Sequence, residues 1–253
     1  MYLLATGWLV VSLRRDDEAS RGWLLPATLG LMLHGAAHYL AWRNTGFTDL
    51  HFFAALSLVG LGMAMLTAVV GASGRMRALG VLVFPLAALV LSGYAWYGHS
   101  TRPDPLDWRL LLHAWLALLA YATLAVAALL AIMLWMQERA LRRHQRHAWL
   151  RAFPPLTELE TLLFRTIAVG FALLTLTLLT GVLFVENLFA QHLVHKTVLS
   201  LLSWLVFGGL LLGRWRRGWR GVTAVRWTLV AMGLLLLAFF GSQFVLELLL
   251  HRE

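Results

Sequence analysis

Histidines are the residues of this chain most able to do chemistry, because the sequence holds ten of them and no cysteine. Without cysteine, the chain itself cannot provide a disulfide, an iron–sulfur cluster, a thiolate-ligated metal or a thioether link to a cofactor. His34 and His38 are four residues apart, so they share one face of a helix. His113 stands near the start of the apolar run WRLLLHAWLALLAYATL, and Tyr121 follows two turns later on nearly the same stripe. A neutral imidazole is a good axial ligand for haem iron and costs less to bury than a carboxylate, so the pattern favours ligation of iron.

The elements that must position these histidines are transmembrane helices. Hydrophobic residues make up 60% of the 253-residue chain and charged residues only 13%, and long uncharged runs recur. This composition predicts an all-α fold, a polytopic transmembrane bundle of about eight spans in a single integral membrane domain. The predicted spans cover residues 1–13, 22–42, 51–71, 76–98, 108–136, 159–185, 196–213 and 222–250. The first is short, and because it has no basic start or cleavage site, we expect a retained span rather than a signal peptide.

Basic residues predict how the spans are oriented. Sixteen of the 21 Lys and Arg residues fall in or next to alternate loops, and five lie on the opposite side. The sixteen belong to the loops 14–21, 72–77, 137–158 and 214–226, with Arg165 just inside the following span. By the positive-inside rule these loops are cytoplasmic, and both termini lie outside, in the periplasm. The basic cytoplasmic loop 137–158 is expected to prolong the fifth helix, turn at Pro154 and Pro155, and contact anionic lipid headgroups rather than nucleic acid.

The histidines are distributed in the opposite way to the arginines. Eight of the ten lie in the outer half of the membrane, at its outer rim or in the outer tail. His34 is roughly 18 Å along the second predicted span, and His113 is roughly 7 Å inside the fifth. His192 and His195 belong to the outer loop 186–196. Two imidazoles from facing helices could clamp one iron in a pocket lined by tryptophan and phenylalanine. The alternative is that these histidines lie at the interface or link helices by hydrogen bonds.

Five motifs follow one another in a characteristic order from His113 onwards. They are LLLHAWLALLAYATL, FPPLTELETLLFRTIAVGFALLTLTLLTGVLF, HKTVLSLLSW, GRWRRGWRG and AFFGSQFV. As a set they resemble the cytochrome c assembly proteins, the CcmC, CcsA and HemX-like group. The chain is most similar to the YpjD-type inner-membrane branch of that family, whose members have eight predicted spans. The similarity covers roughly 105–248 clearly and 28–70 weakly, and it implies a multi-pass protein of the bacterial inner membrane.

The resemblance also implies a function, which is the handling of haem. In the family, histidines in the membrane and at its outer face hold haem, and His113 and His34 match two of these positions. We therefore expect haem b bound non-covalently, with His113 and His34 as leading ligands of the iron and His38, His192 and His195 as alternates. His38 lies at a depth closer to that of His113, and Tyr121 is a further candidate for binding the cofactor. The expected role is carriage, sensing or assembly of haem, so we do not expect an enzyme.

The sequence departs from the family in two places. The family's tryptophan-rich outer loop is replaced by ENLFAQHLVHKTVLSLLSW, and Arg214 occupies the position of a second intramembrane histidine. Delivery of haem to an apocytochrome is therefore not implied for this chain.

Two other functions are compatible with the sequence. The chain could be a non-catalytic accessory or scaffold subunit that contacts another inner-membrane protein, for example in cation efflux, through its basic loops. It could also transport a small solute or a metal ion, with the outer histidines as an entry site. The lack of a deep carboxylate argues against a cation path.

Overall fold

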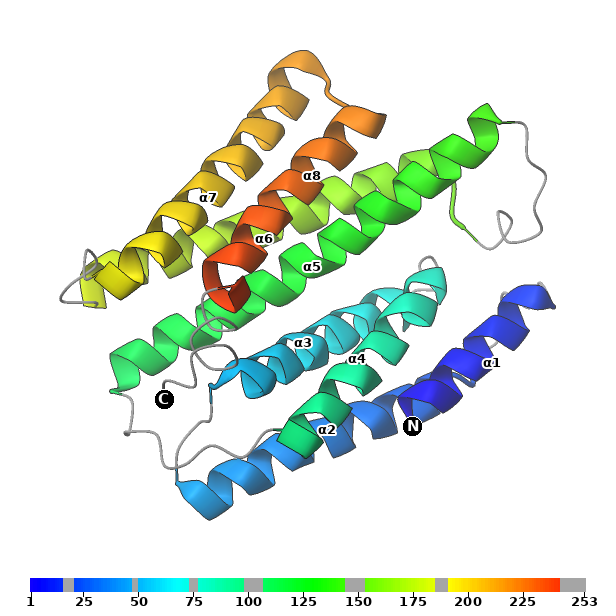
Figure 1. Cartoon of the computed structure of the whole chain (residues 1–253). Helices are drawn as coiled ribbons and strands as arrows, with labels where there is room; N and C mark the ends of the chain where they lie inside the picture. Colours follow the sequence, from blue (N-terminus) through cyan, green and yellow to red (C-terminus); the bar gives the residue numbers. More distant parts are fainter. Residues whose placement is uncertain are drawn as a thin grey trace. The chain divides into compact units, whose positions relative to one another are not determined.

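The computed structural model describes residues 1–15, 21–46, 50–72, 77–97, 107–143, 153–184 and 191–241. These residues form helices joined by short connections, and none of them lies in a strand. The helices are α1 (Tyr2–Arg14), α2 (Leu24–Thr45), α3 (Phe52–Ala72), α4 (Arg77–Tyr97), α5 (Trp108–Arg142), α6 (Leu156–Phe184), α7 (Gln191–Arg217) and α8 (Gly221–Leu236), with a π-helical turn, η2 (Leu237–Gly241), directly after α8 (Figure 1). The predicted all-helical class is confirmed, and each apolar run of the sequence corresponds to one helix.

The ends of the helices differ from the predicted spans where polar residues continue a helix. Helix α5 runs on to Arg142 because the residues after its apolar run, beginning with Gln137 and Glu138, are good helix formers. The expected prolongation of the fifth helix is thus confirmed. Pro154 and Pro155 directly precede α6, where a missing backbone N–H costs no helical hydrogen bond. The predicted last span, 222–250, extends past the described residues, and the part within them ends in η2.

Six of the described helices are long and apolar enough to cross a membrane. They are α3, α4, α5, α6, residues Val194–Arg217 of α7, and Gly221–Phe240. Helix α1 is apolar but has only 13 residues. Helix α2 carries His34, His38 and Arg43, which lower its hydropathy. The total of eight spans and the outer position of both termini therefore remain predictions.

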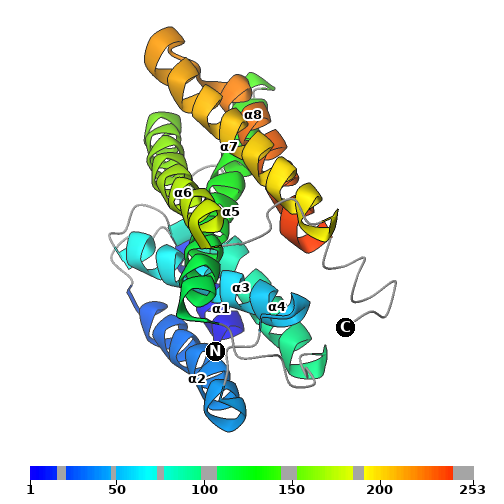
Figure 2. The ribbon, with the colours of Figure 1, turned by 90° about the vertical axis from the view of Figure 1, so that its left-hand side faces the viewer.

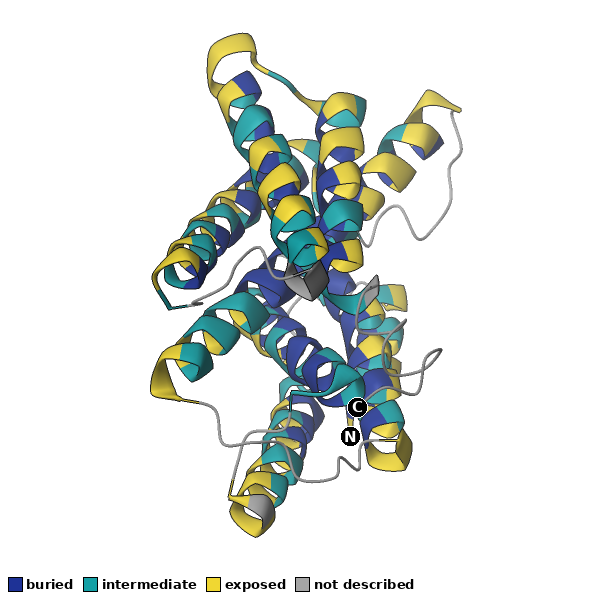
Figure 3. Ribbon diagram, turned by 60° about the vertical axis from the view of Figure 1, so that its left-hand side comes forward, coloured by how far each residue is buried: buried dark blue, intermediate teal, exposed yellow. Residues whose placement is uncertain are grey.

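The chain divides into two compact units, which are described separately. The first contains α1 to α4 and the segment that begins at Arg139. In it α3 packs along α4, α1 packs against α4 and α2, and α2 packs against α3 (Figure 2). A Cβ atom at Gly60 would overlap the Val90 side chain, so this glycine allows α3 and α4 to approach closely. The buried residues of α1 recur every three or four positions, so they lie on one side of this helix. Buried and exposed residues alternate along the helices (Figure 3).

The second unit contains α5 up to Glu138, and α6 to α8 with η2. Hydrogen bonds that involve side-chain hydroxyls connect the helices of this unit. Ser203 of α7 donates a hydrogen bond to the carbonyl of Ala231 on α8, at 2.8 Å. Trp204 of α7 donates its ring N–H to the hydroxyl of Thr175 on α6, at 2.9 Å. In a membrane, apolar helix surfaces are surrounded by equally apolar lipid, so the hydrophobic effect does not bring them together. Hydrogen bonds between helices therefore help to hold them in contact.

Candidate functional site

His113 of α5 is held against α6 by one ring nitrogen. Its Nδ1 lies 3.1 Å from the hydroxyl oxygen of Thr180. That hydroxyl lies 2.9 Å from the carbonyl oxygens of both Leu176 and Thr177, to which it donates its hydrogen. With its hydrogen directed to these carbonyls, the Thr180 oxygen accepts from His113, which assigns the ring hydrogen to Nδ1.

This assignment fixes the tautomer of the neutral His113 ring. With the hydrogen on Nδ1, the lone pair is on Nε2, and no described residue donates a hydrogen bond to that atom. The ring is half-buried. A histidine that ligates a metal almost always donates its other ring N–H to an oxygen nearby, which orients the ring and strengthens the ligand. His113 therefore has the hydrogen-bonding pattern of a metal ligand.

The surroundings of His113 fit a flat ring ligand. A Cβ atom at Gly181 would lie 3.2 Å from His113 Cε1, tighter than ordinary contact, so glycine lets the ring lie close to α6. Trp108 of α5 and Phe184 of α6 meet nearby with ring centres 6.2 Å apart. An imidazole lone pair can ligate haem iron, and large aromatic side chains can contact the flat ring of a haem.

Tyr121 and the two histidines of the α7 region are the other predicted site residues of the second unit. Tyr121 is buried and donates its hydroxyl hydrogen to the carbonyl of Leu235, at 2.6 Å. Its ring contacts Phe239 and Phe240 of η2. His195 is exposed on α7, whereas the side chain of His192 lies outside the described residues. No described hydrogen bond or ring contact joins His113 to Tyr121 or His195, so their role in binding a cofactor remains a prediction.

The first unit contains a different arrangement, a chain of hydrogen bonds across three helices. Nε2 of His34 lies 2.9 Å from the hydroxyl oxygen of Ser57 on α3, and Nε2 of His38 lies 3.0 Å from the same oxygen. Nδ1 of His34 lies 3.2 Å from the hydroxyl oxygen of Tyr2 on α1. His34 and Ser57 are fully buried, Tyr2 is buried and His38 is half-buried. The predicted common face of His34 and His38 is therefore turned to Ser57.

The hydrogens of this Tyr2–His34–Ser57–His38 network can be arranged in two directions. In one, Tyr2 donates to His34, His34 donates to Ser57, and Ser57 donates to His38. In the other, His38 donates to Ser57, Ser57 donates to His34, and His34 donates to Tyr2. In both, His34 uses both ring nitrogens inside the protein. The His38 ring also stacks on Tyr94 of α4, with ring centres 4.4 Å apart, so all four helices contribute.

Sequence reasoning missed Tyr2, Ser57 and Thr180. The available signal was weak, because Tyr2 and Ser57 are single polar residues in apolar helices and Thr180 is one of several threonines in α6. The sequence pattern led us to group His34, His38 and His113 in one predicted site. In the structure these histidines belong to two separate units. Within the described residues, no group of three or more His, Asp or Glu side chains could hold a metal ion. A single axial imidazole does not require such a group.

Arg214, which the resemblance aligns with a family histidine, contacts α6 and the turn after α7. Its guanidinium lies 3.4 Å from Glu160 of α6 and 3.2 Å from the carbonyl of Trp219, and it stacks 4.6 Å from the ring centre of Phe164. Glu160 also accepts a hydrogen bond from the backbone N–H of Gly221. Arg214 thus connects the turn between α7 and α8 to α6.

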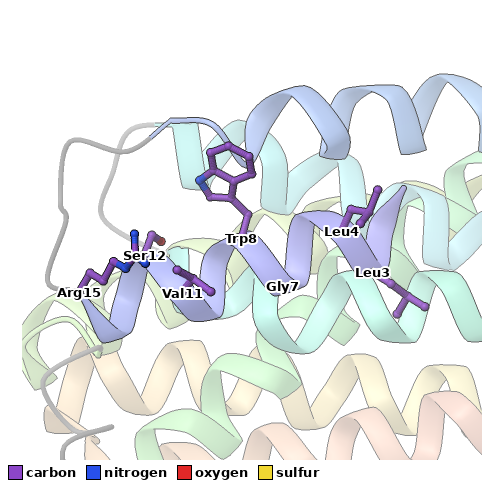
Figure 4. Close-up of a pocket in the computed structure, with 7 residues that line it drawn as sticks. All are labelled: Leu3, Leu4, Gly7, Trp8, Val11, Ser12 and Arg15. Carbon is purple, nitrogen blue, oxygen red and sulfur yellow. The ribbon is translucent and has the colours of Figure 1, made fainter.

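A hollow of about 530 Å³ lies along α1, and no histidine is among the residues that line it. Its lining comes from α1 and the residue after it alone: Leu3, Leu4, Gly7, Trp8, Val11, Ser12 and Arg15 (Figure 4). Leu3, Leu4, Trp8 and Val11 are exposed. Since one helix cannot enclose a ligand, this feature is an open apolar face and not a cofactor pocket.

A helical chain with six membrane-spanning candidates among its described residues, and with histidines inside its helices, has the features of a multi-pass membrane protein. The chain is a member of the cytochrome c assembly protein family, whose family model matches residues 23–250. The resemblance stated from the motif order is thereby confirmed.

Individual relatives agree with this membership. A 141-residue segment is 38% identical to the inner membrane protein YpjD of Escherichia coli K12 and covers 55% of this chain and 53% of YpjD. A segment of equal length is 39% identical to a 28.8 kDa protein from the nifR3-like 5′ region of Azospirillum brasilense, covering 55% of this chain and 52% of the relative. The cytochrome c biogenesis protein CcsA of Chlamydomonas reinhardtii is 27% identical over 156 residues, which are 57% of this chain and 42% of CcsA. The chain thus spans about half the length of the curated relatives it matches. No solved structure matches it.

Proposed function

We propose that this protein binds haem b non-covalently in the bacterial inner membrane, with Nε2 of His113 as an axial ligand of the iron. We further propose that it carries or positions haem without converting it chemically. Membership of the cytochrome c assembly family and the inner-membrane location named for YpjD support this function. The observation that carries the proposal is the hydrogen bond from His113 Nδ1 to Thr180, because it leaves the ligand lone pair on Nε2.

The residues around His113 have distinct tasks in this proposal. Thr180 orients the ring and fixes its tautomer, while Gly181 gives the ring room to lie against α6. Trp108 and Phe184 provide apolar surface at the same end of the two helices. The bound haem would supply an iron centre whose reactivity the axial imidazole tunes. The arginine distribution predicts that this end of α5 faces the outer side of the membrane, which is the side we propose for the haem.

The other predicted ligands differ from His113 in their hydrogen bonds. Nε2 of both His34 and His38 is engaged with Ser57. For His195 the described residues present no such bond, so it could ligate without breaking one. His113 is therefore the leading ligand, and ligation by His34, His38, His192 or His195 stays a prediction.

A haemin titration of the purified protein tests the function. Wild-type protein should give a saturable Soret band, and the His113→Ala variant should lose it or bind at least roughly ten-fold more weakly. His195→Ala removes a weaker candidate, so it should leave a Soret band and lower haemin affinity less than His113→Ala does. A protein that stays colourless after addition of haemin, or a His113→Ala variant that binds like wild type, would refute the proposal.

A further inference from the structure

Arg109 stands on the side of the membrane where this chain has few cations. It belongs to the five Lys and Arg residues that lie opposite the sixteen predicted to be cytoplasmic. Its side chain is exposed, with the guanidinium carbon 5.7 Å from the centre of the Trp108 ring. None of the carboxylates in the described parts of the chain pairs with it. The positive-inside rule does not account for an arginine at this position.

Arg109 precedes His113 by four residues on α5. This spacing places both side chains on one face, with Arg109 about 6 Å nearer to the start of the helix. Arg109 contacts the Trp108 ring, which in turn contacts Phe184 of α6, and His113 contacts Thr180 and Gly181 of the same helix. A ligand bound at His113 Nε2 therefore has the guanidinium one turn away, in the direction of the helix end.

Haem b has carboxylates on only one edge. Its two propionates are charged and the opposite edge is apolar, so the ring in a membrane protein must direct the propionates toward water or a cation. A guanidinium offers a planar fork of donors that matches a carboxylate, and such charge-assisted bonds are stronger than neutral ones. Lys196 is a further cation of the second unit, but its Nζ lies 5.5 Å from the ring centre of Phe239, and it belongs to α7 rather than to the helix of His113.

Resting on the proposed function, we propose that Arg109 binds a propionate carboxylate of the haem whose iron is ligated by His113. Arg109 then determines which edge of the ring faces the end of the helix. Arg109 and His113 then form a two-point site on one helix, in which His113 binds the iron and Arg109 binds the carboxylate. It selects a tetrapyrrole with free propionates over an esterified one.

Titrations with haemin and with haemin dimethyl ester, in which both carboxylates are blocked, test this inference. Wild-type protein should prefer haemin by roughly ten-fold or more. Arg109→Gln should lose most of this preference by weakening the binding of haemin, while its affinity for the diester stays the same. Arg109→Lys should retain part of the preference. Arg43→Gln, which removes another exposed arginine at a helix end, is the matched control and should behave like wild type.

The outcomes separate this inference from the proposed function. An Arg109→Gln variant that keeps the preference for haemin, or loses affinity for haemin and the diester equally, overturns the role of Arg109. If Arg43→Gln and Arg109→Gln lose equal affinity for haemin, the role of Arg109 is also overturned, because such a loss would reflect the overall charge of the protein. If wild-type protein binds neither compound in a His113-dependent way, the proposed function itself fails. Unchanged affinity for the diester also shows that the variant is folded.

Discussion

In the first unit, His34 uses both ring nitrogens in hydrogen bonds to Tyr2 and Ser57, whereas in the second unit His113 uses only Nδ1. The two histidines also differ in exposure, since His34 is fully buried and His113 is half-buried. A buried histidine with every nitrogen satisfied holds helices together. A half-buried histidine with one nitrogen oriented and one lone pair uncommitted is prepared for a ligand. The hydrogen-bond partners, and not the residue type, distinguish the two.

The difference predicts different consequences of mutation. In the first unit, loss of one partner leaves other polar groups buried without a hydrogen bond, which lowers the free energy of unfolding. In the second unit, loss of a partner frees a histidine that reaches the protein surface, so affinity for the ligand should change more than stability. The following variants measure this contrast, beginning with the largest expected effect.

Ser57→Ala should be the most destabilising of the variants. It removes the shared partner of His34 Nε2 and His38 Nε2, and we expect the free energy of unfolding to fall by roughly 2–4 kcal/mol. Unfolding in mixed detergent micelles measures the loss. Ser92→Ala is the matched control, because the exposed Ser92 bonds only to the carbonyl of Ala88. Equal stability of the two variants would contradict a structural role for the network.

Thr180→Ala should weaken haem binding without a comparable loss of stability. Without the acceptor for Nδ1–H, the His113 ring loses its orientation, and we expect haemin affinity to fall by roughly ten- to a hundred-fold. Thr180→Ser retains the hydroxyl and should restore most of the affinity. Thr161→Ala, on the same helix and also bonded to a backbone carbonyl, should change nothing. If Thr180→Ser were as weak as Thr180→Ala, lost packing rather than the hydrogen bond would be responsible.

Tyr121→Phe should affect stability alone. The hydroxyl of Tyr121 is committed to the carbonyl of Leu235, so its removal should cost about 1 kcal/mol of unfolding free energy and leave haemin affinity unchanged. Tyr39→Phe, which alters an exposed tyrosine, is the control. Loss of haemin affinity at unchanged stability would instead place Tyr121 in contact with the cofactor, as its position on the stripe of His113 predicts.

The helices were predictable from the sequence because long apolar runs have few alternatives in a membrane. Their ends were not, since α5 continues beyond its apolar run as an ordinary polar helix. The candidate histidines could be found one at a time by type and depth. Their partners could not, because Ser57 is 23 residues from His34 in sequence and Thr180 is 67 residues from His113. Such contacts depend on how helices pack, which the pattern of a single helix does not contain.

The most direct test of the central claim replaces the His113 side chain with a free ligand. His113→Gly should give no haem spectrum alone, and added imidazole should restore it by occupying the vacated position. Added 1-methylimidazole can ligate iron but has no N–H for Thr180, so it should restore the spectrum only at higher concentration. That difference should disappear in a Thr180→Ala background. A His113→Gly protein that retains the wild-type haem spectrum without added imidazole would contradict the account.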